Sequence, residues 1–186
     1  MRVLKLNLYV LSVLVLASCS DPTEPPAEAA FKSYASPRSG EACNVMGPAS
    51  FGTQKPTSAQ DEGATVQDGF DGASVSCSIK GTGPYAVQAT AAYQGASFSI
   101  AGTVGTDGNG TLTRVTIVSS TTGTLTNTEP CKIDASPAPN SREALRIAPG
   151  EMFAQIDCPA IANSSTPDIT RCQALASFVL LKNCSK

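Results

Sequence analysis

Apolar and polar residues alternate through the middle of the chain. Between Ala73 and Lys80 every second side chain is apolar and the others are serine or lysine, the pattern of a half-buried β-strand. The same period recurs further on, and Gln94-Gly95 and Asp107-Gly-Asn-Gly110 are typical of tight hairpin turns. The pattern predicts four consecutive strands at residues 73–80, 85–93, 96–104 (with Gly102 a candidate for a bulge) and 111–119.

The C-terminal part predicts further, less regular elements. Residues 174–184 are apolar on both faces, which is typical of a central buried strand. Thr166-Pro167-Asp168 has the features of a helix start and predicts a short helix to about Gln173. Residues 121–128 predict a weak strand, which residues 131–133 extend. The segment 142–148 fits a strand or a helical turn, and residues 152–158 predict a strand.

The N-terminal part lacks this periodicity. Residues 20–38 begin with an acidic, proline-rich stretch and predict an extended linker, with a helical turn or two at 27–34. Residues 40–63 predict an irregular segment with a short strand around Ser50-Phe51. Together, many short strands and hairpin turns predict an all-β fold: an antiparallel β-sandwich or partly open barrel with short helical turns, bridged by disulfides.

The first residues form a targeting pattern. Arg2 and Lys5 precede an apolar run over 6–16, which is shorter than the roughly 20 residues that span a membrane. The run ends in Leu16-Ala17-Ser18-Cys19. These four residues resemble the lipobox of bacterial lipoproteins, in which the cysteine receives a diacylglycerol and becomes the new N-terminus.

The resemblance implies an organisation and an address. Residues 1–18 would be a lipoprotein signal peptide, 19–39 a lipid-anchored tether and 40–186 the β domain. The lipid on Cys19 would make the membrane a partner, because two acyl chains give stable anchoring. Enterobacterial lipoproteins that are retained at the inner membrane have Asp directly after the lipidated cysteine. This chain has Ser20 there, which implies an outer-membrane location with the folded domain facing the periplasm or the cell surface.

The cysteine count agrees with lipidation. The chain has seven cysteines, so assigning Cys19 to lipid leaves six for three disulfides in an oxidising compartment. Without a CxxC motif or histidine, no zinc site is expected. Six cysteines allow 15 pairings. The interpretation favoured here is Cys158–Cys172, closing a hairpin loop, with Cys43–Cys77 and, by remainder, Cys131–Cys184.

The region from Cys43 to Cys184 resembles small uncharacterised lipoproteins of myxobacteria, which combine a proline-rich tether with a cysteine-bridged β domain. The resemblance is one of cysteine layout and implies no catalytic residues. It leaves the ligand of the folded part open.

Charge and composition exclude several classes of function. Removing Arg2 and Lys5 with the signal peptide changes the net charge from −2 to −4, which argues against nucleic-acid binding. The absence of histidine excludes Ser-His-Asp and Cys-His catalysis. An envelope hydrolase of the glycosidase type, using two of Glu129, Glu151 and Asp157, is the alternative that stays open.

The prediction is therefore a non-enzymatic binding or structural module, without a cofactor, that contacts an envelope protein or a glycan. Asp68-Gly-Phe-Asp-Gly72 and Asp107-Gly-Asn109 contain oxygen ligands suited to calcium, but Asp-Gly pairs are also preferred turn residues, and turns are the favoured interpretation. Tyr85 and Tyr93, on one face of a predicted strand, are expected in the core.

Overall fold

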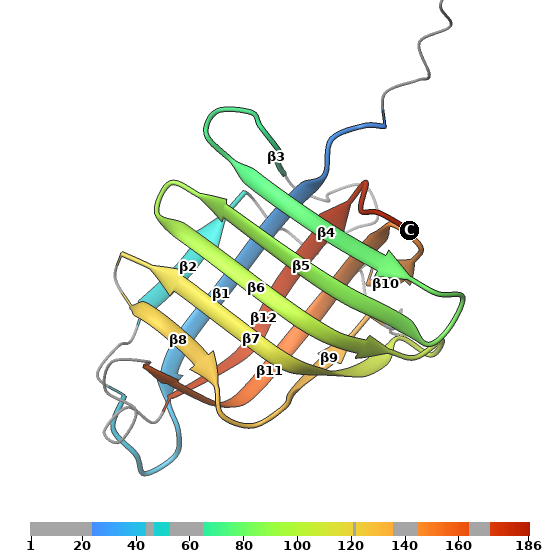
Figure 1. Ribbon diagram of the computed structural model, residues 1–186. Helices are drawn as coiled ribbons and strands as arrows, with labels where there is room; N and C mark the ends of the chain where they lie inside the picture. Colours follow the sequence, from blue (N-terminus) through green and yellow to red (C-terminus); the bar gives the residue numbers. More distant parts are fainter. Residues whose placement is uncertain (1–23, 44–46, 53–64, 121, 136–144, 164–171) are drawn as a thin grey trace, which may run out of the picture.

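The regular structure is entirely β in the part of the chain that the computed structural model describes, residues 24–43, 47–52, 65–120, 122–135, 145–163 and 172–186. There, twelve strands pair antiparallel in one sheet (Figure 1), which confirms the predicted all-β class. The strands are β1 (Glu28–Pro37), β2 (Gly47–Phe51), β3 (Val66–Gln67), β4 (Ser74–Lys80), β5 (Tyr85–Tyr93), β6 (Ala96–Val104), β7 (Asn109–Ser119), β8 (Gly123–Asn127), β9 (Cys131–Asp134), β10 (Arg146–Ala148), β11 (Glu151–Asn163) and β12 (Cys172–Lys182).

The strand order is β2-β1-β12-β11-β8-β7-β6-β5-β4, with β3 paired to β1 and β10 to β11. β8 and β9 occupy successive stretches of the same position, since both pair with β7 on one side and β11 on the other. At the break between them, the Asn127 side chain replaces backbone pairing. Its Oδ1 accepts from the Val115 N–H at 2.7 Å, and its Nδ2 donates to the Thr113 carbonyl at 3.2 Å.

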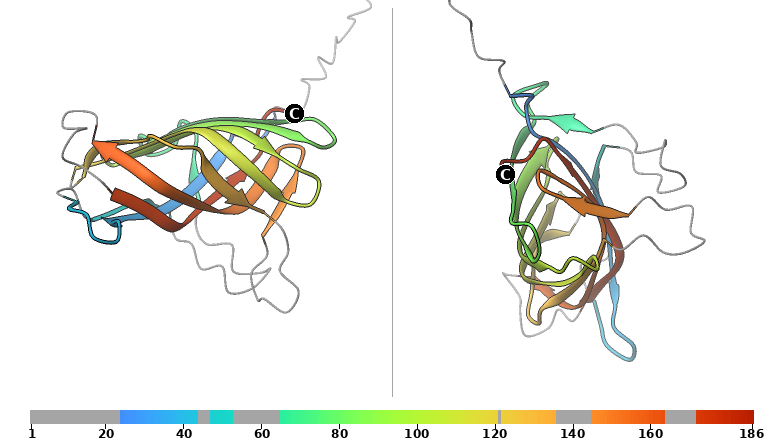
Figure 2. Two further views of the ribbon diagram at one scale, coloured as in Figure 1. Left: turned by 90° about the horizontal axis from the view of Figure 1, so that it is seen from below. Right: turned by 90° about the vertical axis from the view of Figure 1, so that its right-hand side faces the viewer.

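The sheet curves into a small closed barrel with extra strands (Figure 2). Residues after β12 pair with β4, the last strand in the order. The Ile79 N–H of β4 donates to the Ser185 carbonyl at 2.9 Å, and the Ser185 N–H donates to the Cys77 carbonyl at 3.0 Å. The last residues of the chain therefore lie against the sheet edge that β4 provides.

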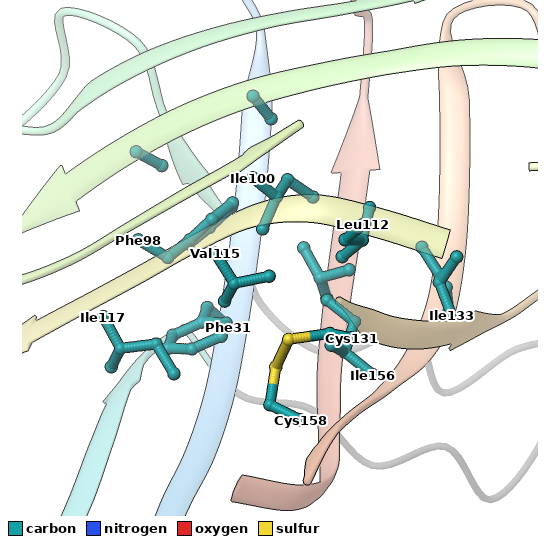
Figure 3. Close-up of a cluster of buried hydrophobic side chains, with 14 of the residues drawn as sticks. Phe31, Phe98, Ile100, Leu112, Val115, Ile117, Cys131, Ile133, Ile156 and Cys158 are labelled. Atoms are coloured by element: carbon teal, nitrogen blue, oxygen red, sulfur yellow. A yellow bond between two sulfur atoms is a disulfide. The ribbon is translucent and has the colours of Figure 1, made fainter. Parts of the chain in front are cut away.

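Inward-facing side chains fill the barrel with apolar atoms. Phe31, Phe51 and Phe98 form a buried aromatic group, with ring centroids 4.9 Å apart for Phe31–Phe98 and 5.8 Å for Phe51–Phe98. Small residues such as Ala89 and Ala91 occupy other inward positions on β5. Figure 3 shows the disulfide Cys131–Cys158 within this core.

The predicted hairpins are confirmed. The strands expected at 73–80, 85–93, 96–104 and 111–119 are β4 to β7, and the register between β6 and β7 shifts at Ala101/Gly102, the predicted bulge position. Gln94 and Gly95 both have positive φ, 48° and 81°, as a two-residue type I′ hairpin turn requires.

The predicted tether is wrong for residues 28–37. These residues form β1, paired with β12 on one edge and with β2 on the other, so the folded unit begins well before residue 40. The helical turns expected at 27–34 are also wrong. Alanine has the highest helix propensity, but tertiary contacts routinely override propensity, and hydrogen bonding along both edges of β1 does so here.

Other predictions have mixed outcomes. The central strand expected at 174–184 is confirmed as β12, between β1 and β11, and the short strand near Ser50-Phe51 is β2. The segment 142–148, which fitted either strand or helix, contains β10. Of the predicted helix at 166–173, residues 166–171 lie outside the described residues, and Cys172 and Gln173 belong to a strand.

All six cysteines expected to form disulfides do so, but each predicted pairing is wrong. The bonds are Cys43–Cys172, Cys77–Cys184 and Cys131–Cys158, rather than Cys158–Cys172, Cys43–Cys77 and Cys131–Cys184. Each bond follows a strand contact. Pro37 opposes Cys172 across β1 and β12, residues after β12 lie against β4, and Lys132 of β9 opposes Asp157 of β11.

Candidate functional site

The end of the barrel where the chain enters β1 is the first candidate region. Cys19, the predicted lipidation site, lies outside the described residues. The Asn183 Nδ2 donates to the Pro26 carbonyl at 3.1 Å, and the Asp68 N–H donates to the Ala27 carbonyl at 2.9 Å. The chain is thus fastened to the barrel from Pro26 onward, near the C-terminus (Figure 1).

The three carboxylates considered for hydrolysis, Glu129, Glu151 and Asp157, are not all close together. Glu151 and Asp157 lie six residues apart on β11, which places their backbones about 20 Å apart. Glycosidase carboxyl groups are separated by roughly 5 to 9.5 Å. Glu151 is paired with Arg146, and Asp157 accepts from the Ala176 N–H at 2.6 Å. Glu129 is exposed after the end of β8.

The two Asp-Gly segments form turns. The Asp68 Oδ1 accepts from the Val75 N–H at 2.8 Å, and the Asp107 carboxylate accepts from the Asn109 N–H at 3.1 Å and from its side-chain amide at 3.2 Å. The backbone and side-chain hydrogen bonds from Asn109 hold the pKa of Asp107 below its ordinary value. These carboxylates therefore stabilise their own turns.

Within the described ranges, no three His, Cys, Asp or Glu side chains are grouped so that they could hold a metal. We expect the melting temperature of the protein to be unchanged in millimolar calcium, because the turn carboxylates already accept backbone hydrogen bonds. Differential scanning fluorimetry with calcium, and with magnesium as the control cation, measures this. A rise of several degrees with calcium alone would show that one of the turns binds the ion.

A surface hollow of about 370 Å³ lies beside the first of these turns. Its lining comes from β3 and the residue before it, from the turn after β3 and from the end of β5: Thr65, Val66, Gln67, Phe70, Asp71 and Tyr93. Phe70 is 70 % exposed, the most exposed of the large apolar side chains in the described residues. Sequence reasoning missed this hollow. The sequence feature that could have indicated the hollow is Phe70, an aromatic residue between two Asp-Gly pairs. An aromatic side chain at the tip of a turn is not buried in the core, so it is available for another contact.

Tyr93 packs against the core and also lines the hollow. As expected, it packs partly against the core, and so does Tyr85. Its hydroxyl donates to the Asp71 Oδ2 at 2.9 Å and accepts from the Gln94 Nε2 at 2.9 Å. The hydrogen bond to Asp71, with lesser effects of desolvation and of the Asp71 charge, raises the pKa of Tyr93 above its ordinary value. Asp71 and Tyr93 thus form a hydrogen-bonded acidic wall.

Comparisons of the chain with protein families, with curated proteins and with solved structures found no match. In the described ranges, no helical segment has the length and apolar character needed to cross a bilayer.

Proposed function

We propose that the chain is a lipid-anchored protein of the bacterial cell envelope, placed at the outer membrane, whose barrel is a non-enzymatic binding or structural module. The observation that carries the proposal is the cysteine pairing. Six of the seven cysteines are joined in three disulfides, and the remaining one, Cys19, is the cysteine of the lipobox-like sequence. Disulfides also persist best in oxidising compartments such as the periplasm.

The attachment of the chain to the barrel supports a domain held close to the membrane. The segment from Cys19 to Pro26 spans at most about 25 Å when extended, and Pro26 is already hydrogen bonded to Asn183. The end of the barrel that carries β3 and the C-terminal residues would then face the lipid. The opposite end and the barrel sides would be available to an envelope protein or a glycan.

A non-enzymatic role is supported by the sequence and by the site geometry. The chain has no histidine. Glu151 and Asp157, two of the carboxylates considered for hydrolysis, are far apart on one strand and each has a hydrogen-bonding partner.

The lipid anchor is tested by substitution of its cysteine. We expect Cys19→Ser to abolish incorporation of radioactive palmitate, because serine offers no thiol for the thioether. The neighbouring Ser20→Ala variant is the control and should be labelled like the unmodified sequence. Equal label in the Cys19→Ser protein would refute lipidation at this residue, and fractionation of the labelled protein with inner membranes would refute the outer-membrane placement.

A further inference from the structure

We infer that the hollow between Phe70 and Tyr93 binds a ligand that carries a cationic ammonium group. This names a ligand class for the proposed binding module and rests on that proposal only in taking the barrel to be a binding protein. The inference stands on four features of the hollow: an exposed aromatic ring, a second aromatic side chain, a carboxylate hydrogen bonded to that second side chain, and a hydrogen-bonded turn that carries the exposed ring and the carboxylate.

The exposed ring has no role in the core. Phe70 is 70 % exposed, although a phenylalanine gains most when it is buried. Its contribution to folding is therefore small, and a contact with a ligand would cover apolar surface that the fold leaves open. Aromatic faces attract cations through their quadrupole, and the attraction strengthens when the cation loses water in a hollow.

The charge around the hollow favours a cation over an anion or a neutral ligand. Asp71 lines the hollow. Asp68 lies on the same turn, and the Glu28 Oε2 accepts a hydrogen bond of 2.5 Å from the Thr65 hydroxyl, which belongs to another lining residue. Among the described residues that line the hollow, none is Lys or Arg. An ammonium group placed here meets negative charge and aromatic side chains together.

The turn that carries Phe70 is held by its own hydrogen bonds. The Phe70 N–H donates to the Gln67 carbonyl at 3.1 Å, and the Ala73 N–H donates to the Phe70 carbonyl at 2.9 Å. The Gly69 N–H donates to the Ala73 carbonyl at 3.0 Å. A hydrogen-bonded turn lowers the entropy that binding would cost, because the backbone that carries the aromatic ring is already in position.

The hollow is also close to the start of the folded chain. β3 pairs with the beginning of β1 at Glu28 and Ala29, next to the residues that lead toward Cys19. In an anchored protein it would lie near lipid headgroups, some of which carry ammonium groups. A soluble amine in the envelope offers the same chemistry, so the experiment uses both sources.

The test is an NMR titration of the mature protein in a non-ionic detergent, following the ring signals of Phe70 and Tyr93. The probes are choline and its neutral isostere, in which a tert-butyl group replaces the trimethylammonium group. We expect choline to bind at least tenfold more tightly than the isostere. Equal binding of the two, preferential binding of a neutral disaccharide, or no shift with choline would overturn the inference.

Variants locate the binding. Phe70→Ala is expected to weaken choline binding at least tenfold, and Asp71→Asn severalfold. The matched control is Leu175→Ala, which removes another exposed apolar side chain, 47 % exposed, on β12. An unchanged affinity in Phe70→Ala, or an equal loss in Leu175→Ala, would refute the assignment to this hollow.

Two further measurements distinguish a lipid headgroup from a soluble ammonium compound, and distinguish failure of this inference from failure of the proposed lipid anchor. Vesicles of phosphatidylcholine that shift the same signals more strongly than free choline identify a lipid headgroup as the better ligand, whereas a weaker or equal shift identifies a soluble ammonium compound. Both results support an ammonium site. Palmitate labelling is read independently, so a failure to bind choline leaves the anchor intact, and loss of the anchor leaves the choline titration unaffected.

Discussion

Replacing both Cys131 and Cys158 with alanine is expected to lower the free energy of unfolding by about 3 to 4 kcal/mol. The bond joins residues 27 apart in sequence, and the loss of loop closure in the unfolded chain accounts for about this amount. Both cysteines are buried in the core beside the residues shown in Figure 3, so no solvent contact compensates for the bond. The loss is a large share of the roughly 5 to 15 kcal/mol by which domains are usually stable.

Urea denaturation of the double variant and the unmodified protein, both under oxidising conditions, measures this difference. Peptide mapping by mass spectrometry supplies the control, because it must recover Cys131 joined to Cys158 in the unmodified protein. A change below about 2 kcal/mol, which is the low end for removal of a native disulfide, would contradict the expectation. A peptide that joins Cys131 to Cys184 would contradict the observed pairing.

Phe98→Ala is expected to lower the free energy of unfolding by about 3 to 5 kcal/mol, the usual cost of removing a buried phenylalanine. The Phe98 ring contacts those of Phe31 and Phe51, and its side chain is only 2 % exposed. The three rings come from β6, β1 and β2, so the substitution removes contacts between strands from opposite parts of the sheet.

Phe70→Ala is the matched control, because it removes the same ring from an exposed turn. Its unfolding free energy should stay within about 0.5 kcal/mol of the unmodified value. Chemical denaturation of both variants gives the comparison. Similar losses in the two proteins would mean that the Phe31, Phe51 and Phe98 group is not the centre of the core. A stable Phe70→Ala protein also ensures that its loss of choline binding reports the hollow.

Local elements were predictable because their causes are local. The alternation in residues 73–119 and the positive-φ turn residues between the strands suffice to predict β4 to β7 as consecutive hairpins. The same holds for the turn role of Asp68 and Asp107, whose carboxylates bond to backbone groups two to seven residues away.

β1 shows where a local pattern misleads. Its inward positions are Ala29, Phe31, Ser33 and Ala35, a weak apolar face that begins just after a proline-rich stretch. Ser33 is tolerated inside because its hydroxyl pairs at 2.8 Å with that of Ser177 on β12. A buried hydroxyl with a partner costs little, but the partner is 144 residues away in the sequence and is invisible to any local pattern.

The sequence by itself determined the all-β class, the central hairpins and the six cysteines that form disulfides, because period, turn chemistry and cysteine number are properties of short segments or of composition. Only the tertiary structure decided the disulfide pairing, the place of β1 and the hollow beside Phe70. Each of these depends on which distant strands become neighbours when the sheet curves into a barrel, and that choice is made by the packing of the whole core.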